Sequence, residues 1–412
     1  MANNSFYDIG ALGVRIGDPY SPTNTDMNVP HETTVENNIV EGYGRVIPAS
    51  FGIGQGAGHK NLYDYNEVYD GYHCAISISH QVPDGIHPPG VGNSDNTISF
   101  NHVHHLLQGI MNDGGSIRIE AGNNLFTASG NKIWNNKIHD TSDASAIDNI
   151  TNDSQPGYGG DGIYLDNATG DVDVEYNLVY RVSGNAVYAP HGSNIPGHPI
   201  TVNNNILAYA RHAMISVNSP YYDAPHTPIP TTPNAVSQVF IVTNNIFYFD
   251  RSSASSPGFF LNGDCTFTPF TYTQPDGYGL FQDFHDNIYW RTDGHFEGDA
   301  SGFNVQPNPV NGGADAPCAG SQANDPGDYK FYDFKGWKMT IGEDKGSFVA
   351  NPNFASPAYP WDNYTILGSL PNPGFQVFDP NEAGRYGFLP WQRPPAVKPA
   401  FQTYPFNPAT DF

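Results

Sequence analysis

The chain has 412 residues, only 14% of them charged, and 41 acidic against 17 basic residues give it a formal net charge of −24. Such a surface repels nucleic acid and acidic membranes, because phosphate groups are bound by clustered Lys and Arg. We therefore expect no nucleic-acid partner and no membrane partner. The many Gly, Pro, Tyr and Phe residues are typical of a turn-rich, all-β protein.

The N-terminal sequence MANNSFYDIG lacks the basic start and the apolar core of a signal peptide. It enters strand-like sequence at once, so we expect a trimmed or fragmentary form of a secreted or cell-surface protein. No apolar run approaches the roughly 18 residues of a membrane span. Cys74, Cys265 and Cys318 are too few for a disulfide scaffold. A Cys265–Cys318 disulfide and three free thiols are both open alternatives.

One short phrase recurs along most of the chain, from VENNIV (35–40) through WNNKIH (134–139) to HDNIYW (285–290). Each copy places an Asn before an apolar residue, and the copies are 28 to 42 residues apart. This irregular spacing suits solenoid coils separated by loops of variable length. We predict that the side chains of these residues stack from coil to coil and hydrogen-bond the next rung: Asn38, Asn66, Asn101, Asn136, Asn177, Asn205, Asn245 and Asn287.

Between these copies lies a second phrase with alternating apolar residues, as in CAISIS (74–79), GSIRIE (115–120) and DGIYLD (161–166). Two or three short strands per unit, without helix signals, predict a right-handed parallel β-helix over residues 1–300. A β-sandwich or a propeller is the alternative, but neither of those folds needs a stacked Asn in every unit.

After about residue 291 the phrase fades into a polar link rich in Gly and Pro. We expect residues 301–412 to form a loop-rich C-terminal cap and a Pro-rich extended tail packed on the helix. A solenoid needs its last rung covered. Trp337, Phe348 and Phe354 are the aromatic residues expected to cover it.

Strand residues alternate between the two faces of a sheet, so the outward residues of successive coils should form columns. One predicted column contains Ser77, Arg118, Tyr164 and Tyr188, and the next contains Ser79, Glu120, Asp166 and Pro190. Asp113 and Asp161 lie on turns that lead onto this face. An acidic patch beside Arg, Tyr and His residues predicts a carbohydrate site, with substrate bound by Arg118, Tyr164, Tyr188, His191, Asp161 and His73.

Glycoside hydrolysis requires one protonated and one ionised carboxyl group, about 5–5.5 Å apart for retention and about 6.5–9.5 Å for inversion. Glu120 and Asp166, on neighbouring coils, would approach the shorter distance, and their repulsion would raise one pKa. Simpler roles exist for each group: Asp113 before two Gly residues suits a turn, Asp166 could end a strand, and Arg118 with Glu120 could form a solvated pair.

The order of NDGG-I, NN-IHD, GYGG-GIYLD, V-YN-VYR and NNNI-AYA, followed by W…GEDKGS…NPNF, resembles the β-helix proteins around glycoside hydrolase family 141. The resemblance covers nearly the whole chain and implies Asp113 and Asp166 as the catalytic pair. At the position of Glu120 those relatives more often have an apolar residue, so this sequence departs from the pattern there. The resulting order of catalytic candidates is Asp166, Asp113 and Glu120.

These patterns predict a secreted glycoside hydrolase acting on a poly- or oligosaccharide. A polysaccharide lyase or uronate epimerase is the second hypothesis, weakened by the scarcity of basic residues to neutralise a uronate. The third is a non-catalytic adhesin, spike or glycan-binding scaffold, since the fold does not fix the function.

No cofactor is required by the predicted chemistry. The histidines of the recurring phrase are interpreted as turn or surface residues, and no His or Cys spacing suggests zinc; these residues are His102, His104, His105 and His139. The run DNATGDVD (166–173) leaves a structural calcium ion open, although it is not a complete EF-hand loop.

Overall fold

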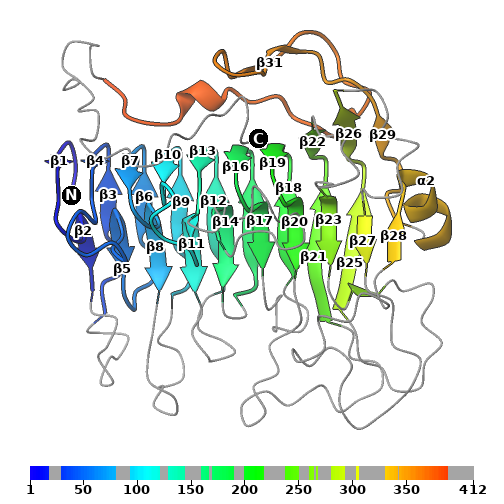
Figure 1. Ribbon diagram of the computed structural model, residues 1–412. Coiled ribbons are helices and arrows are strands. Elements are labelled where there is room, and N and C mark those ends of the chain that lie inside the picture. Colours follow the sequence, from blue (N-terminus) through cyan, green and yellow to red (C-terminus); the bar gives the residue numbers. More distant parts are fainter. Residues whose placement is uncertain are drawn as a thin grey trace, which may run out of the picture.

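The computed structural model shows an elongated solenoid built almost entirely of parallel strands (Figure 1). It describes residues 1–17, 29–79, 93–120, 129–143, 159–166, 169–189, 199–217, 237–249, 259–263, 266–267, 280–292, 303–305, 330–341 and 343–387.

Three long sheets run along the solenoid, and as far as β23 every third strand of the chain joins the same sheet. Sheet I contains β1 (Ser5–Tyr7), β4 (Ile39–Glu41), β7 (Glu67–Gly71), β10 (His102–Leu106), β13 (Lys137–Thr141), β16 (Leu178–Val182), β19 (Ile206–Ala210), β22 (Ile246–Phe249), β26 (Ile288–Arg291) and β29 (Phe348–Val349). Sheet II contains β2 (Val14–Ile16), β5 (Ile53–Gln55), β8 (Ile76–Ser79), β11 (Gly115–Glu120), β14 (Asp161–Asp166), β17 (Asn185–Ala189), β20 (Ala213–Val217), β23 (Phe259–Gly263), β27 (Phe303–Val305) and β28 (Lys330–Tyr332).

Sheet III completes each coil. It contains β3 (Thr34–Glu36), β6 (Leu62–Asp64), β9 (Thr97–Ser99), β12 (Asn131–Trp134), β15 (Val172–Glu175), β18 (Ile200–Asn203), β21 (Ser237–Thr243), β25 (Leu280–His285) and β24 (Thr266–Phe267). The all-β solenoid predicted from the repeats is thereby confirmed. Strands on both sides of residue 300 belong to the same sheets, since β27, β28 and β29 all join them.

The alternating apolar residues fill the inside of the coils. On sheet II, Ile117 lies opposite Ile76 and Ile163, and Ile163 lies opposite Val187. All four side chains are fully buried. Because the side-chain period of a strand is two, this register leaves Arg118 and Glu120 on the other face of β11.

The predicted Asn ladder is present along one bend of the coils. The backbone N–H and the side-chain amide of Asn101 both donate to Oδ1 of Asn136, at 2.9 and 3.0 Å, and the same pattern continues from Asn38 to Asn287. The residue before each of these Asn has a left-handed backbone, as at Tyr65, Phe100 and Asn135. A second, shorter ladder joins Asn61, Asn96 and Asn131, which the sequence analysis did not predict.

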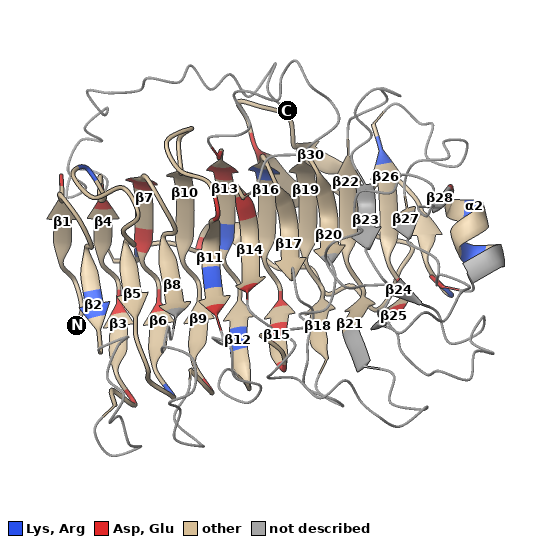
Figure 2. Ribbon diagram, turned by 60° about the horizontal axis from the view of Figure 1, so that its bottom comes forward, with Lys and Arg blue, Asp and Glu red and all other residues tan. Residues whose placement is uncertain are grey.

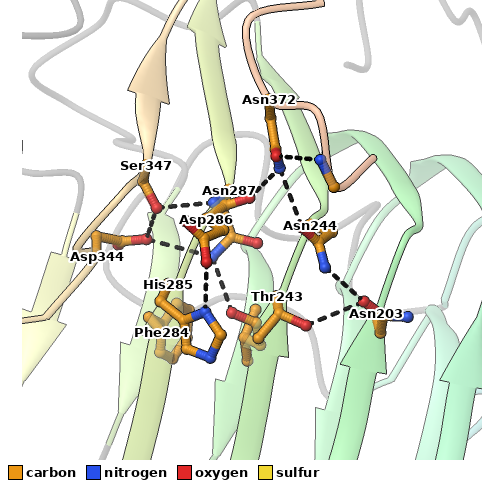
Figure 3. Close-up of polar contacts among 12 residues, drawn as sticks. Asn203, Thr243, Asn244, Phe284, His285, Asp286, Asn287, Asp344, Ser347 and Asn372 are labelled. Carbon is orange, nitrogen blue, oxygen red and sulfur yellow. Dashed lines mark hydrogen bonds and ion pairs between the residues drawn. The ribbon is translucent and has the colours of Figure 1, made fainter. Parts of the chain in front are cut away.

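The last rung of the ladder is closed by the chain that follows it (Figure 3). The backbone N–H of Asn287 donates to Oγ of Ser347 at 2.7 Å, and its side chain donates to Asp344 at 3.2 Å. Trp337, in the short helix η2 (Trp337–Ile341), donates to Asp344 at 2.6 Å and stacks on Phe303. Phe354 is also buried, but it packs against Tyr248 and Tyr364 outside the core of the coils, and Phe348 is 37% exposed. The predicted covering role is therefore wrong for both of these residues.

Two further short helices and one hairpin complete the described chain: α2 (Phe334–Gly336), η3 (Pro380–Glu382), and β30 (Phe354–Ser356) paired with β31 (Asn363–Ile366). After β31 the chain returns along one edge of the solenoid towards its N-terminal end (Figure 1). We call residues 367–387 the strap. Its residues form hydrogen bonds with bends of the solenoid: Asn372 with Asn244, Gln376 with Asn204, and Tyr386 with Asn37.

Candidate functional site

The outward residues of sheet II form the two predicted columns. Arg118 lies opposite Ser77 and Tyr164, and Tyr164 lies opposite Tyr188. Glu120 lies opposite Ser79 and Asp166 in the adjacent column. Pro190 and His191 lie outside the described residues, as do Cys265 and Cys318.

Arg118 joins the two acidic residues of the second column. Its Nη2 atom donates to Asp166 and lies 3.2 Å from Oε2 of Glu120. All three side chains are buried, with exposures of 7% for Arg118, 2% for Glu120 and 5% for Asp166. Figure 2 shows the basic and acidic positions of β11 and β14 on neighbouring strands. The expectation of a solvated pair is therefore wrong, because these charges are removed from water.

Burial and pairing act in opposite directions on Arg118. Burial alone would lower the pKa of its guanidinium, but the charges of Glu120 and Asp166 outweigh burial and raise that pKa. Arg118 is therefore a permanent cation between two carboxyl groups. Both carboxyl groups contact one nitrogen atom, so their nearest oxygens lie within about 6 Å of each other, a separation on the scale of a retaining pair.

Aromatic rings border this charged group. The rings of Tyr164 and Tyr188 stack with their centroids 5.5 Å apart, and Cζ of Arg118 lies 5.4 Å from the centroid of Tyr164. The hydroxyl of Tyr164 donates to Oδ1 of Asp113 at 3.2 Å. Tyr164 thus links Asp113 to Arg118.

Asp113 itself lies in the exposed turn before β11, with a left-handed backbone at φ 54°. Asp tolerates this conformation, and its carboxylate suits turns. Asp113 therefore lies in a turn, as predicted, with its carboxylate on the hydroxyl of Tyr164. Its carbonyl oxygen lies 3.2 Å from Nε2 of His73, whose ring stacks on Phe51.

Asp113 and Asp166 lie at opposite ends of two paired strands. Asp113 precedes Gly115, the first residue of β11, whose partner is Asp161, whereas Asp166 ends β14 opposite Glu120. Both strands have six residues, and a strand of that length spans about 16 Å. The Asp113 carboxylate contacts the hydroxyl of Tyr164, which is two residues before Asp166 on β14. The pair implied by the family resemblance remains a prediction, and Glu120 is the residue that lies directly opposite Asp166.

Asp161 is enclosed by the backbone of the neighbouring coil. Its Oδ1 accepts hydrogen bonds from the backbone N–H and the side-chain amide of Asn185, at 2.7 and 2.8 Å. A Cβ atom added at Gly184 would lie 2.4 Å from that oxygen. Burial raises the pKa of Asp161 to about 7, against the lowering effect of Asn185. This enclosure indicates a structural role in place of the predicted contact with substrate.

Cys74 is a site residue that the sequence analysis missed. It is a buried free thiol next to His73 and close to the backbone N–H of Gly115. Burial alone would raise the pKa of Cys74, but His73 and Arg118 outweigh burial and lower it. The Cys charge in turn raises the pKa of His73 against its own burial. The only signal in the sequence was the adjacency of His73 and Cys74 before a strand.

The acidic run 166–173 is divided among separate partners. Asp166 contacts Arg118, Asp171 accepts a hydrogen bond from the N–H of Gly130 at 3.1 Å, and Asp173 lies in β15. Within the described parts of the chain, the groups that bring three potential metal ligands within 4.8 Å of one another lie on sheet I and involve histidines. These histidines are not turn residues as expected, since His102, His104 and His139 lie in strands.

No protein-family model, curated protein or solved structure matches the chain. The relationship to glycoside hydrolase family 141 remains a prediction from the sequence. In the part of the chain that the structure describes, no helix is long and apolar enough to cross a membrane.

Proposed function

We propose that the protein is a secreted glycoside hydrolase with Glu120 and Asp166 as its catalytic carboxyl groups. The observation that carries the proposal is their direct pairing across β11 and β14 on one arginine. A poly- or oligosaccharide is the proposed substrate, and Tyr188, in the neighbouring column, is the proposed surface for a sugar ring. Right-handed coiling, typical of crossovers between parallel strands, and membership of the family 141 group belong to the same proposal.

The two carboxyl groups have different proposed roles. Asp166 makes the closer contact with Arg118 and is the proposed nucleophile. Glu120, at the longer distance of 3.2 Å, is the proposed acid. Its proton passes to the glycosidic oxygen while an Asp166 oxygen bonds to the anomeric carbon and the bond to the leaving group breaks.

The second half of the reaction reverses these roles. The Glu120 carboxylate removes a proton from water, the water oxygen bonds to the anomeric carbon, and the bond to Asp166 breaks. Arg118 holds Asp166 in place throughout, and it binds Glu120 more strongly whenever Glu120 is ionised.

Reducing-sugar release from a broad panel of plant and microbial glycans tests the proposal. Glu120→Gln and Asp166→Asn should each reduce release by at least about 1,000-fold, since each removes a group used in both steps. The control is Glu175→Gln, which alters a partly buried carboxylate of β15 on sheet III and should leave release unchanged.

Other results would favour the other hypotheses. Unsaturated products would indicate a lyase, and glycan binding without any turnover would indicate a scaffold. Equal activity of the wild type and both site variants would overturn the catalytic assignment.

A further inference from the structure

Sheet I carries a group of histidines that the proposed hydrolysis does not use. On neighbouring strands, His102 lies opposite Glu67 of β7, and His104 lies opposite His139 of β13. The ring of His104 stacks between Tyr69, at 4.7 Å, and His139, at 5.0 Å between centroids. The sheet register therefore fixes these imidazole rings relative to one another.

A chain of hydrogen bonds assigns the protons on two of the rings. Arg181 donates to both oxygens of Asp140, at 2.7 and 2.8 Å, which keeps that group ionised. Asp140 lies 2.6 Å from Nδ1 of His139, so Nδ1 carries a proton and donates it. Nε2 of His139 is then an acceptor, and it lies 2.9 Å from Nε2 of His102. His102 must donate from Nε2, which leaves its Nδ1 atom with a free lone pair.

That lone pair faces two other electron-pair donors. Nδ1 of His102 lies 3.9 Å from Oε1 of Glu67, and Nε2 of His104 lies 4.0 Å from the same oxygen. Nε2 of His104 is buried and has no hydrogen-bond partner among the described residues. One ligand atom from each of the three residues fits within a span of 4.8 Å. Nδ1 of His104 lies 2.7 Å from Nδ1 of His105, and when His104 donates this bond its Nε2 atom presents a lone pair to Glu67. In that tautomer three lone pairs converge, and a cation between them would relieve their repulsion.

The C-terminal strap covers this group. Gly384 lies against His102 with φ 96°, and a Cβ atom there would come within 3.0 Å of Cβ of His102. Asp362, which precedes the strap in the sequence, accepts a hydrogen bond from Nη2 of Arg181 at 2.9 Å. Two residues far away in the sequence therefore contact this group: Gly384 packs on His102, and Asp362 binds Arg181, the first residue of the hydrogen-bonded chain.

We propose that Glu67, His102 and His104 bind one divalent transition-metal ion of the Zn²⁺ type. Two imidazoles and one carboxylate suit Zn²⁺ and its neighbours, whereas Ca²⁺ and Mg²⁺ take oxygen ligands. Around a tetrahedral zinc ion the ligand atoms are about 3.3–3.4 Å apart, so each of the two nitrogen–Glu67 distances must shorten by about 0.6 Å. His139, Asp140 and Arg181 orient His102 from behind, as the outer shell of a metal site does.

Metal content and calorimetric titration of the chelator-treated, full-length protein with ZnCl₂ test the site. The expected result is one Zn²⁺ per chain, and Co²⁺ added to the chelator-treated protein should give visible absorption typical of a nitrogen- and oxygen-bound ion. His104→Gln and Glu67→Gln should each weaken binding by at least 100-fold. Asp140→Asn, which removes the charge behind His139, should weaken it by about 10–100-fold.

His31→Gln is the matched control, because His31 is also stacked on a histidine of the next coil, His59, at 5.3 Å. It should leave Zn²⁺ affinity unchanged. Affinity equal in the wild type, His104→Gln and Glu67→Gln, or CaCl₂ binding as tightly as ZnCl₂, would overturn the proposal. Circular dichroism of each variant separates loss of the site from loss of the fold, and glycan hydrolysis is not part of the readout.

Discussion

Arg118 is the residue on which the proposed carbohydrate site depends. It is buried between Glu120 and Asp166, and removing one partner of a buried ionic group leaves an uncompensated charge. We predict that Arg118→Met lowers the free energy of unfolding by about 3–5 kcal/mol, measured by urea denaturation.

The triple variant Arg118→Met, Glu120→Gln, Asp166→Asn provides the control for that prediction. It removes all three charges together, so most of the lost stability should return. If the triple variant is as unstable as the single one, the lost stability comes from the packing of the Arg118 side chain and not from its charge.

Asp161 should make stability depend on pH. Its pKa in the folded protein, about 7, lies above the ordinary value of 3.8. A raised carboxyl pKa stabilises the folded protein below the unfolded pKa, and that stability is lost as the pH rises towards 7. Relative to the wild type, Asp161→Asn should therefore gain up to about 1.4 kcal/mol per pH unit between pH 4 and 7, and nothing further above pH 7. A constant difference across pH 4–9 in chemical denaturation would contradict the assignment.

Much of the site at this scale was predictable from the alternation of residues in β11 and β14. The alternation of strand residues predicted that Arg118 and Glu120 point outward, and the repeat predicted that Asp166 lies beside Glu120 on the next coil. The burial of Asp161 was not predictable, because it depends on Asn185 and Gly184 of the next coil. The resemblance to a family favoured Asp113, whose carboxylate contacts Tyr164 of the next coil.

At the scale of elements, the Asn ladder decides the register of the coils. The recurring Asn predicted the ladder correctly. The left-handed backbone before each Asn was not predicted, because the residues there have little in common, as Tyr65, Phe100 and Asn135 illustrate. The shorter ladder was missed because its members Asn61, Asn96 and Asn131 lie outside the recurring phrase.

Asn136→Ala tests the ladder. It removes the acceptor of two bonds from Asn101 and the donor to the carbonyl of Ile98. Buried groups left without partners cost about 1–3 kcal/mol each, so we predict a loss of about 2–4 kcal/mol in the free energy of unfolding. Asn363→Ala, which removes an exposed acceptor of the Thr365 N–H in β31, should lose less than about 1 kcal/mol. Equal losses for the two variants would show that stacking of the coils does not depend on the ladder.

At the scale of the whole molecule, the strap ties the C-terminal coils to the N-terminal ones. The sequence predicted a tail packed on the helix, but not its path. That path depends on single contacts with bends far away in the sequence, such as Tyr386 with Asn37 and the N–H of Gly384 with the carbonyl of Phe100 at 2.7 Å.

Two strap glycines provide a matched test. Gly384 and Gly387 both have positive φ, but only Gly384 is packed, whereas nothing lies within 4 Å of a Cβ atom at Gly387. Each Ala variant carries the left-handed strain of about 1–2 kcal/mol, and Gly384→Ala adds a contact with His102. We predict faster hydrogen exchange at residue 384 in Gly384→Ala than in Gly387→Ala. Identical exchange in the two variants would mean that the strap is not seated on His102.

The most direct test of the proposed site is the anomeric configuration of the first product, followed by ¹H NMR on a glycan that the enzyme cleaves. Glu120 and Asp166 meet on one nitrogen of Arg118, so their nearest oxygens lie within about 6 Å of each other, close to the separation of a retaining pair. We predict that the first product retains the configuration of the substrate. A first product of inverted configuration would contradict the assignment of this pair.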